Sequence, residues 1–245
     1  MQSAIRNTLH QVFHQVIGSE PNHEERLNLL EVGCKLSVTF CDEEHEHMLK
    51  EIHRLSGMHT PYQRIGDSWK YLGFQSRDPA RDIRGGGVLA LENLTYFLSN
   101  HTTKCHNMIS SRTGGRITSD ITWESFPWAP AGMNITRLLA GLFDIVEPSG
   151  RVKTASFNRK TYYPLLSQVD GFNRIYCIAF LLLDRLWVDM RATYMDFPAV
   201  LAALRDQLQT DLLLSPNLEA LESRVYTTLG YTWVGGEKGG SIRGE

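Results

Sequence analysis

The chain has no long apolar segment. Its longest unbroken apolar run covers residues 175–183, whereas an α-helix needs about 20 apolar residues to cross a bilayer core. The N-terminus also lacks the apolar stretch of a secretory signal. These absences predict a cytoplasmic protein with no membrane span of its own, whose contact with a membrane would be peripheral and through a partner.

Cysteine is sparse, and neither charge sign dominates. The cysteines lie far apart and form no CxxC pair, so we expect reduced, packed thiols at Cys34, Cys41, Cys105 and Cys177. The 25 basic residues nearly balance the 27 acidic ones, for a net charge of −2. This balance supplies no overall attraction to nucleic acid or anionic lipid, and we predict no nucleic-acid partner.

The usual marks of an enzyme are missing as well. The sequence contains no GxxxxGK[ST] phosphate loop, and no Ser-His-Asp order, paired carboxylates or nucleophilic cysteine stands out. The histidines are scattered, and His45, His47 and His53 lack the i, i+4 spacing of a zinc-binding helix. We therefore expect no metal, no cofactor and no catalytic turnover by this chain alone.

Apolar residues recur at three- and four-residue steps, which is the period of an amphipathic helix. No convincing run of alternating strands with hairpin turns is present, so the fold class is predicted to be all-α, a single compact multi-helix domain with irregular connecting loops. The helix at 24–37 is expected to bury Leu27, Leu30, Cys34 and Leu36, and the one at 172–190 to cross the core. Expected helices cover residues 5–17, 24–37, 42–56, 88–100, 138–143, 172–190, 199–214 and 218–229.

Three loops are also expected. Residues 110–121 are polar and include two glycines, which favours a mobile loop. Residues 123–131 contain two tryptophans and two prolines and predict a rigid aromatic connector. Asn134 or Thr136 is then a candidate cap for the helix that follows, and the basic, aromatic stretch 151–163 is expected to be a solvated loop.

The most informative stretch is 69–94. It places Arg84 directly before Gly85, Gly86 and Gly87, ahead of an apolar helical pattern. Glycine allows a backbone or a partner to approach closely, so the guanidinium is a candidate for reaching into a partner. The alternative is a structural arginine paired with a nearby aspartate, Asp82 or Asp78. The expected helix start after the glycines also offers free N–H groups that suit an anion.

The order Trp69-x3-Gly73-Phe74-Gln75-x3-Pro79-x2-Asp82-x-Arg84-Gly85-x-Gly87 resembles the signature of the ELMO (engulfment and cell motility) domain family. The pattern continues into Leu89, Leu91 and Leu94, and Tyr62 and Arg64 fit the run-in. A second block of the family resembles Phe126, Pro127, Gly132, Asn134 and Thr136. The chain departs from the signature at Arg81, Ile83 and Ala90, none of which is the arginine at its end.

The resemblance implies a division of the chain. Residues 42–214 would form the ELMO domain, with N-terminal helices in 1–41 packed on it. A C-terminal helix would occupy 215–234, and 235–245 are expected to be a disordered tail because they are rich in glycine and charge.

The resemblance also implies an activity. Small ELMO-domain-only proteins act as GTPase-activating proteins for Arf-family GTPases in their GTP-bound state, and Arg84 would be the catalytic arginine finger. GTP and Mg²⁺ would belong to the partner. The residues implied to bind the partner or support the loop are Trp69, Gly73, Phe74, Gln75, Pro79, Asp82, Gly85 and Gly87.

Two other functions stay open at this point. Larger relatives use the domain as a non-catalytic scaffold that supports a Rac exchange factor, and in such a module Trp69, Asp82 and Arg84 would be buried and bonded to one another. A helical adaptor without a GTPase partner is the third possibility. Arg77 and Arg81 lie in the same stretch and are alternative fingers.

Overall fold

A computed structural model describes residues 18–112 and 125–230. Within these residues the fold is all-α, as predicted, and β-structure is limited to two isolated bridges, Ser19 with Lys160 and Val146 with Val152. The predicted helix at 5–17, most of the predicted loop at 110–121 and the predicted tail at 235–245 lie outside the described residues.

The α-helices are α2 (His23–Ser37), α3 (Asp42–Leu55), α4 (Pro79–Asp82), α5 (Gly87–Asn100), α6 (Thr102–Arg112), α7 (Trp128–Leu142), α8 (Gly171–Asp189), α9 (Phe197–Leu214) and α10 (Leu218–Thr228). Short 3₁₀ helices connect them: η1 (Asp67–Leu72), η2 (Ile83–Gly85), η3 (Tyr163–Leu165) and η4 (Tyr194–Asp196). None of the helices in these ranges is both long and apolar enough to cross a membrane.

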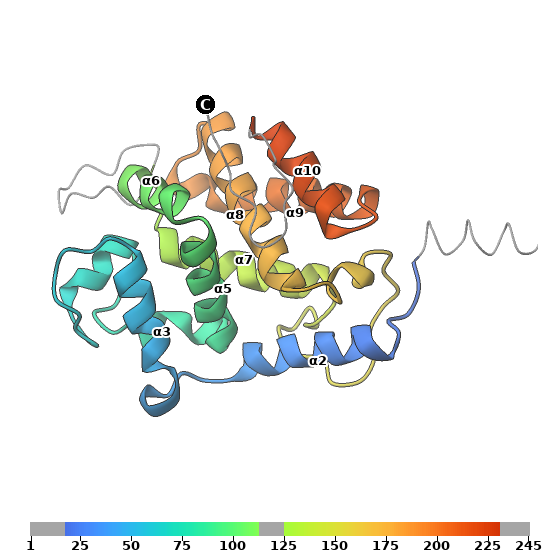
Figure 1. The fold of residues 1–245 in the computed structure, drawn as a ribbon, viewed down its shortest axis with the longest axis horizontal. Helices are drawn as coiled ribbons and strands as arrows, with labels where there is room; N and C mark the ends of the chain where they lie inside the picture. Colours follow the sequence, from blue (N-terminus) through green and yellow to red (C-terminus); the bar gives the residue numbers. More distant parts are fainter. Residues whose placement is uncertain (1–17, 113–124, 231–245) are drawn as a thin grey trace, which may run out of the picture.

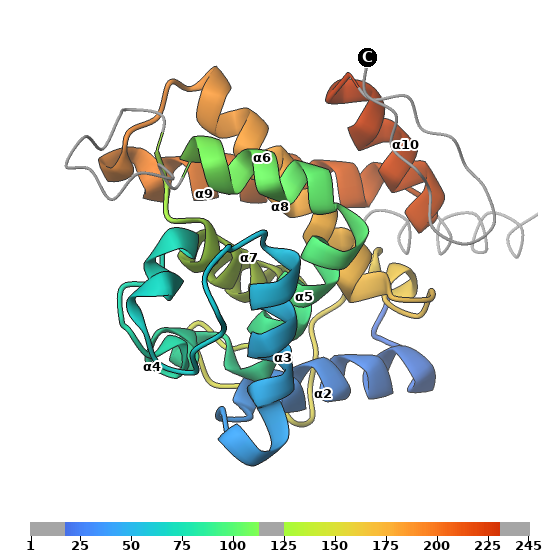
Figure 2. The same cartoon turned by 60° about the vertical axis from the view of Figure 1, so that its left-hand side comes forward.

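Helix α5 lies at the centre of the molecule (Figure 1). It contacts α2, α3, α6, α7 and α8, and α8 in turn contacts α9 and α10. Of the residues expected on its apolar face, Leu91, Leu94, Phe97 and Leu98 are buried, and Tyr96 is partly buried. In Figure 2, which is turned by 60°, α3 stands beside α5, α2 lies below and α6 above.

Helix α8 crosses the core as predicted, with twelve buried residues between Gly171 and Trp187. Its Phe180 ring stacks on Phe97 of α5 at 4.8 Å and on Trp128 of α7 at 5.4 Å. Aromatic pairs of this kind add about 0.5–1.5 kcal/mol beyond the area that they bury. Helices α5, α7 and α8 therefore meet at one aromatic cluster.

The buried face of α2 differs from the prediction. Leu27 is 56% exposed and Cys34 is exposed, whereas Leu29 and Gly33 are buried. A Cβ on Gly33 would lie 2.8 Å from Cγ1 of Val152. The segment that carries Val152 approaches α2 so closely that only the face with Gly33 can pack against it. The hydrophobicity of the α2 residues alone does not identify this face.

The start of α7 was also predicted wrongly. The helix begins at Trp128 after Pro127, within the expected aromatic connector. Pro130 lies in the first turn of this helix. Proline is tolerated there because the first N–H groups of a helix have no partner within it. Thr136 lies inside the helix, buried, and donates to Asn93 Oδ1 at 2.9 Å.

Two other features qualify the sequence predictions. Cys105 and Cys177 are packed as expected, and burial raises the pKa of both thiols, but Cys34 is exposed and Cys41 partly exposed. Helix α6 was not predicted at all, and it extends to Arg112, whose guanidinium binds Asp184 of α8 at 2.7 Å.

Candidate functional site

Two short helical turns carry Arg84. Asp78 caps the first turn, α4, by accepting a hydrogen bond from the N–H of Ala80 at 3.0 Å, and Pro79 is buried at its first position. The second turn, η2, follows without a break, and its Ile83 is buried while Arg84 is exposed. The backbone is therefore anchored on both sides of a side chain that points to solvent.

Asp82 fixes the approach to these turns. Its Oδ2 accepts hydrogen bonds from the backbone N–H groups of Gln75 at 2.7 Å and Ser76 at 3.1 Å. Hydrogen bonds to a charged acceptor are stronger than those between neutral groups. Gln75 and Asp82 are in contact through the backbone N–H of Gln75, and the Gln75 residue is exposed.

Trp69 anchors the same stretch in the core. It is fully buried, its indole N–H donates to the carbonyl of Gln63 at 2.9 Å, and its ring meets the edge of Phe74 at 5.7 Å. Gly73 has φ +86°, and a Cβ there would lie 2.8 Å from Cα of Pro127. The first block of the signature thus packs directly on the start of the second block.

The glycines after Arg84 have different surroundings. Gly85 is exposed, whereas Gly86 and Gly87 are buried. Gly87 has φ +57°, and a Cβ there would lie 2.3 Å from the carbonyl oxygen of Leu36, at the end of α2. Close approach at Gly87 therefore serves contact within the chain, and a partner can reach only Gly85 of the three.

The expected anion site at the start of α5 does not have the predicted form. The N–H of Val88 donates to the carbonyl of Val38 at 3.1 Å, and the N–H of Ala90 to that of Gly86 at 3.1 Å. Gly86 and Gly87 are also buried. The segment that follows α2 therefore covers this helix start, and its N–H groups do not face solvent as an anion site would require.

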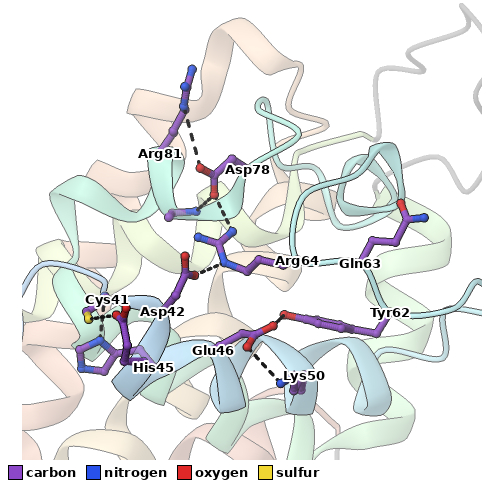
Figure 3. A network of polar contacts seen from close by, with 12 residues as sticks. Cys41, Asp42, His45, Glu46, Lys50, Tyr62, Gln63, Arg64, Asp78 and Arg81 are labelled. Carbon is purple, nitrogen blue, oxygen red and sulfur yellow. Dashed lines mark hydrogen bonds and ion pairs between the residues drawn. The ribbon is translucent and has the colours of Figure 1, made fainter.

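Arg64 ties α3 to the start of the Arg84 turns (Figure 3). Its guanidinium is bonded to Asp42, at the start of α3, and to Oδ1 of Asp78 at 2.7 Å. It also lies over the ring of Phe40, 4.7 Å from the centroid. The sequence assigned Arg64 only to the run-in, whereas the structure makes it the link between two segments.

Tyr62 extends this network along α3. Its hydroxyl donates to Glu46 at 3.1 Å, and Lys50 binds the other oxygen of the same carboxylate at 3.0 Å (Figure 3). Burial raises the pKa of Tyr62, and the neighbouring Glu46 carboxylate raises it further. The hydroxyl is therefore a proton donor at neutral pH and holds the run-in against α3.

The arginines of the signature stretch differ in their partners. Arg77 lies 3.4 Å from Asp67, and Arg81 lies 4.0 Å from Asp78. Arg84 forms no ion pair or hydrogen bond with any other described residue. The arrangement in which Trp69, Asp82 and Arg84 are buried and mutually bonded is absent, because Asp82 binds backbone and Arg84 is exposed.

A further cation adjoins this turn and was not found from the sequence. Arg137 of α7 is exposed, and its Nη1 lies 2.6 Å from the point that a Cβ on Gly85 would occupy. Arg137 lies 53 positions after Arg84 in the sequence, so no local pattern signals that the two are close. The packing of α7 against η2 brings the two together.

Residues 28–201 match the ELMO/CED-12 family. The chain belongs to the ELMO/CED-12 family. It is 33% identical over 180 residues to ELMO domain-containing protein C of Dictyostelium discoideum, which covers 71% of this chain and 27% of that protein. It is 30% identical over 199 residues to mouse ELMO domain-containing protein 1, with 74% of this chain and 59% of that protein covered.

The chain is also 31% identical over 161 residues to mouse engulfment and cell motility protein 3, with 64% of this chain and 21% of that protein covered. The matched part thus spans between 21% and 59% of the length of these three relatives. The ELMO/CED-12 match begins within α2, ahead of the boundary expected at Asp42. The contact between Leu36 and Gly87 therefore lies inside the matched region.

Proposed function

We propose that this ELMO/CED-12 protein is a GTPase-activating protein for Arf-family small GTPases, and that Arg84 enters the nucleotide site of the GTP-bound partner. The observation that carries the proposal is the state of Arg84: exposed, without a partner among the described residues, and mounted on a braced turn. A cytoplasmic location, and membrane contact through the GTPase, are parts of the same proposal.

GTP hydrolysis is accelerated by an exposed arginine of this kind. During GTP hydrolysis negative charge builds on the oxygens around the γ-phosphate, and a guanidinium supplied in trans offers a fixed charge with paired donors. An arginine finger contributes about 10³ to 10⁵ in rate, roughly 4–7 kcal/mol. GTP and Mg²⁺ remain with the GTPase, so the chain itself needs no cofactor.

The contacts that hold this turn matter because an arginine finger must stay extended toward the partner and not pack against its own protein. The hydrogen bonds of Asp82 and the Arg64 bridge hold the turn before Arg84, and the contact of Gly87 with α2 holds the turn after it. A side chain fixed at its base pays less ordering entropy when the GTPase binds. Arg77 and Arg81 are less suited because each already has a carboxylate partner.

The test is single-turnover GTP hydrolysis by a panel of purified Arf and Arf-like GTPases with the wild-type chain and with Arg84→Lys and Arg84→Ala. Lysine keeps the charge and loses the planar fork, so we expect both variants to lose at least about 100-fold of the acceleration. Arg77→Lys and Arg81→Lys are matched controls from the same stretch and should retain most of it.

Circular dichroism and thermal melting of each variant accompany the assay. Because Arg84 is exposed, its variants should melt within about 2 °C of the wild type. If no GTPase is accelerated, or if Arg84→Lys accelerates hydrolysis as the wild type does, the finger assignment is wrong. Binding without acceleration would favour the non-catalytic scaffold.

A further inference from the structure

A groove of about 720 Å³ is lined by residues of α7 and α9 and by Lys160. Arg137 is a neighbour of both the turn and the groove, because its guanidinium lies beside Gly85 and its side chain lines the groove. Arg137 therefore links the Arg84 turn to the groove, as a neighbour of both.

The groove is basic although the chain as a whole is acidic. It is lined by three cations, Arg137, Lys160 and Arg205, and one acid, Asp206, whereas the chain carries −2. Asp206 is paired with Arg205 at 3.6 Å. Arg137 has no carboxylate partner among the described residues, so positive charge in the groove is not neutralised by the fold.

The rest of the lining is mainly apolar and comes from both helices. Leu138 and Leu142 line it from α7, and Pro198 and Leu201 from α9. A volume of this size suits a few side chains of a protein segment. The groove thus combines a charge that recognises acids with apolar surface that a small free anion would leave uncovered.

We propose that this groove docks an acidic, partly apolar surface segment of the GTPase while Arg84 occupies the nucleotide site. This inference rests on the proposed function and names the second contact of the same partner. Charge complementarity at such a contact guides encounter and sets specificity. Arg137 is the positioning residue between the two contacts, and Arg205 and Lys160 recognise the segment.

The test compares charge reversals at two similar arginines. Arg205→Glu alters the groove, and Arg54→Glu on α3 is the control; their side chains are 58% and 66% exposed, and each is paired with an acid close in sequence. Lys160→Glu reverses the charge of a second groove cation, which lies in a different segment. If both variants have the same effect, a local folding defect at Arg205 is not its cause. Melting temperatures establish that the variants are folded.

Two quantities are measured with the full chain. One is the Kd for Arf and Arf-like GTPases loaded with a non-hydrolysable GTP analogue, and the other is the concentration of the chain that gives half-maximal acceleration. Arg205→Glu and Lys160→Glu should each raise both about tenfold, with a much smaller change in the rate at saturation. Arg54→Glu should change neither by more than about twofold.

The outcomes separate the two proposals. If the groove variants bind the GTPase as the wild type does while Arg84→Lys loses acceleration, the groove assignment is overturned and the finger stands. If binding weakens in the groove variants but the wild type accelerates nothing, the groove stands and the finger falls. If no GTPase binds or is accelerated, both are overturned.

A lipid arm completes the experiment. The same variants are sedimented with vesicles of phosphatidylserine and phosphatidylcholine. Loss of vesicle binding by Arg205→Glu and Lys160→Glu, with GTPase binding unchanged, would make the groove a site for anionic lipid and would overturn the proposal. Vesicle binding that is the same for wild type and variants, together with weakened GTPase binding, supports it.

Discussion

The three glycines after Arg84 should respond very differently to a single methyl group. At Gly87 the left-handed backbone costs a residue with a Cβ about 1–2 kcal/mol. The added Cβ would also lie 2.3 Å from the Leu36 carbonyl oxygen and 2.6 Å from that of Lys35. Both neighbours are backbone atoms, so the end of α2 must move.

The magnitude follows from these distances. An ordinary carbon–oxygen contact is about 3.3 Å, so relief requires a shift of about 1 Å in packed backbone, and overpacking of this kind costs about 1–3 kcal/mol. Alanine also lowers the conformational entropy of the unfolded chain, which offsets about 0.4–1 kcal/mol of this destabilisation. We expect Gly87→Ala to lower the free energy of unfolding by about 2–4 kcal/mol and the melting temperature by roughly 5–15 °C.

Two neighbouring substitutions serve as controls. A Cβ on Gly85 would meet Nη1 of Arg137, the free end of a flexible side chain, so Gly85→Ala should change stability by at most about 0.5 kcal/mol. A Cβ on Gly141, inside α7, would have nothing within 4 Å. Gly141→Ala should therefore stabilise the protein by about 0.5–1 kcal/mol, as expected for glycine in a helix.

Urea unfolding followed by circular dichroism, with thermal melting alongside, measures all three variants. The expected order of stability is Gly141→Ala above wild type, Gly85→Ala near wild type and Gly87→Ala far below. A Gly87→Ala protein that unfolds with the wild type, or a Gly85→Ala protein that is equally damaged, would refute the role given to α2 in bracing the turn.

Two further predictions concern the rest of the structure. Arg64→Gln should lower the free energy of unfolding by about 2–3 kcal/mol in urea titrations, because the partly buried Asp78 loses its ion pair; the loss should shrink in a variant that already lacks Asp78, and an undiminished loss would contradict the pairing. Burial, with a smaller effect of the nearby Lys104 charge, lowers the pKa of His101 to about 4, below that of an unfolded histidine, about 6.5. The unfolded chain then binds a proton that the folded chain does not between these values, so stability falls with falling pH, by about 2 kcal/mol from pH 7 to pH 5. His101→Phe should remove most of this pH dependence, and an unchanged dependence would assign it to other groups.

Much of the fold could be predicted because it depends on local pattern. The apolar periods of α5 and α8 identify their helices and their buried residues, and the acidic start of α3 marks where that helix begins. The order of residues from Trp69 to Gly87 identified the ELMO/CED-12 family. Each of these signals lies within about 20 residues of chain, so no knowledge of packing is required.

The errors have a common physical cause. The buried face of α2 is selected by the approach of Val152 to Gly33, and the start of α7 by packing of Trp128 against Phe97 and Phe180. Both depend on segments distant in sequence. The hydrophobicity of the two faces of α2 differs little, so the contact between Val152 and Gly33 determines which face is buried.

The sequence by itself determined the helical class, the family and the choice of Arg84 as the residue of interest. The tertiary structure decided what surrounds it: an exposed guanidinium, a carboxylate that binds backbone rather than the arginine, and a turn braced by α2. It also placed Arg137 beside the same turn and in the lining of a basic groove. Burial, ion pairing and surface charge arise from residues far apart in the chain, and only folding brings them together.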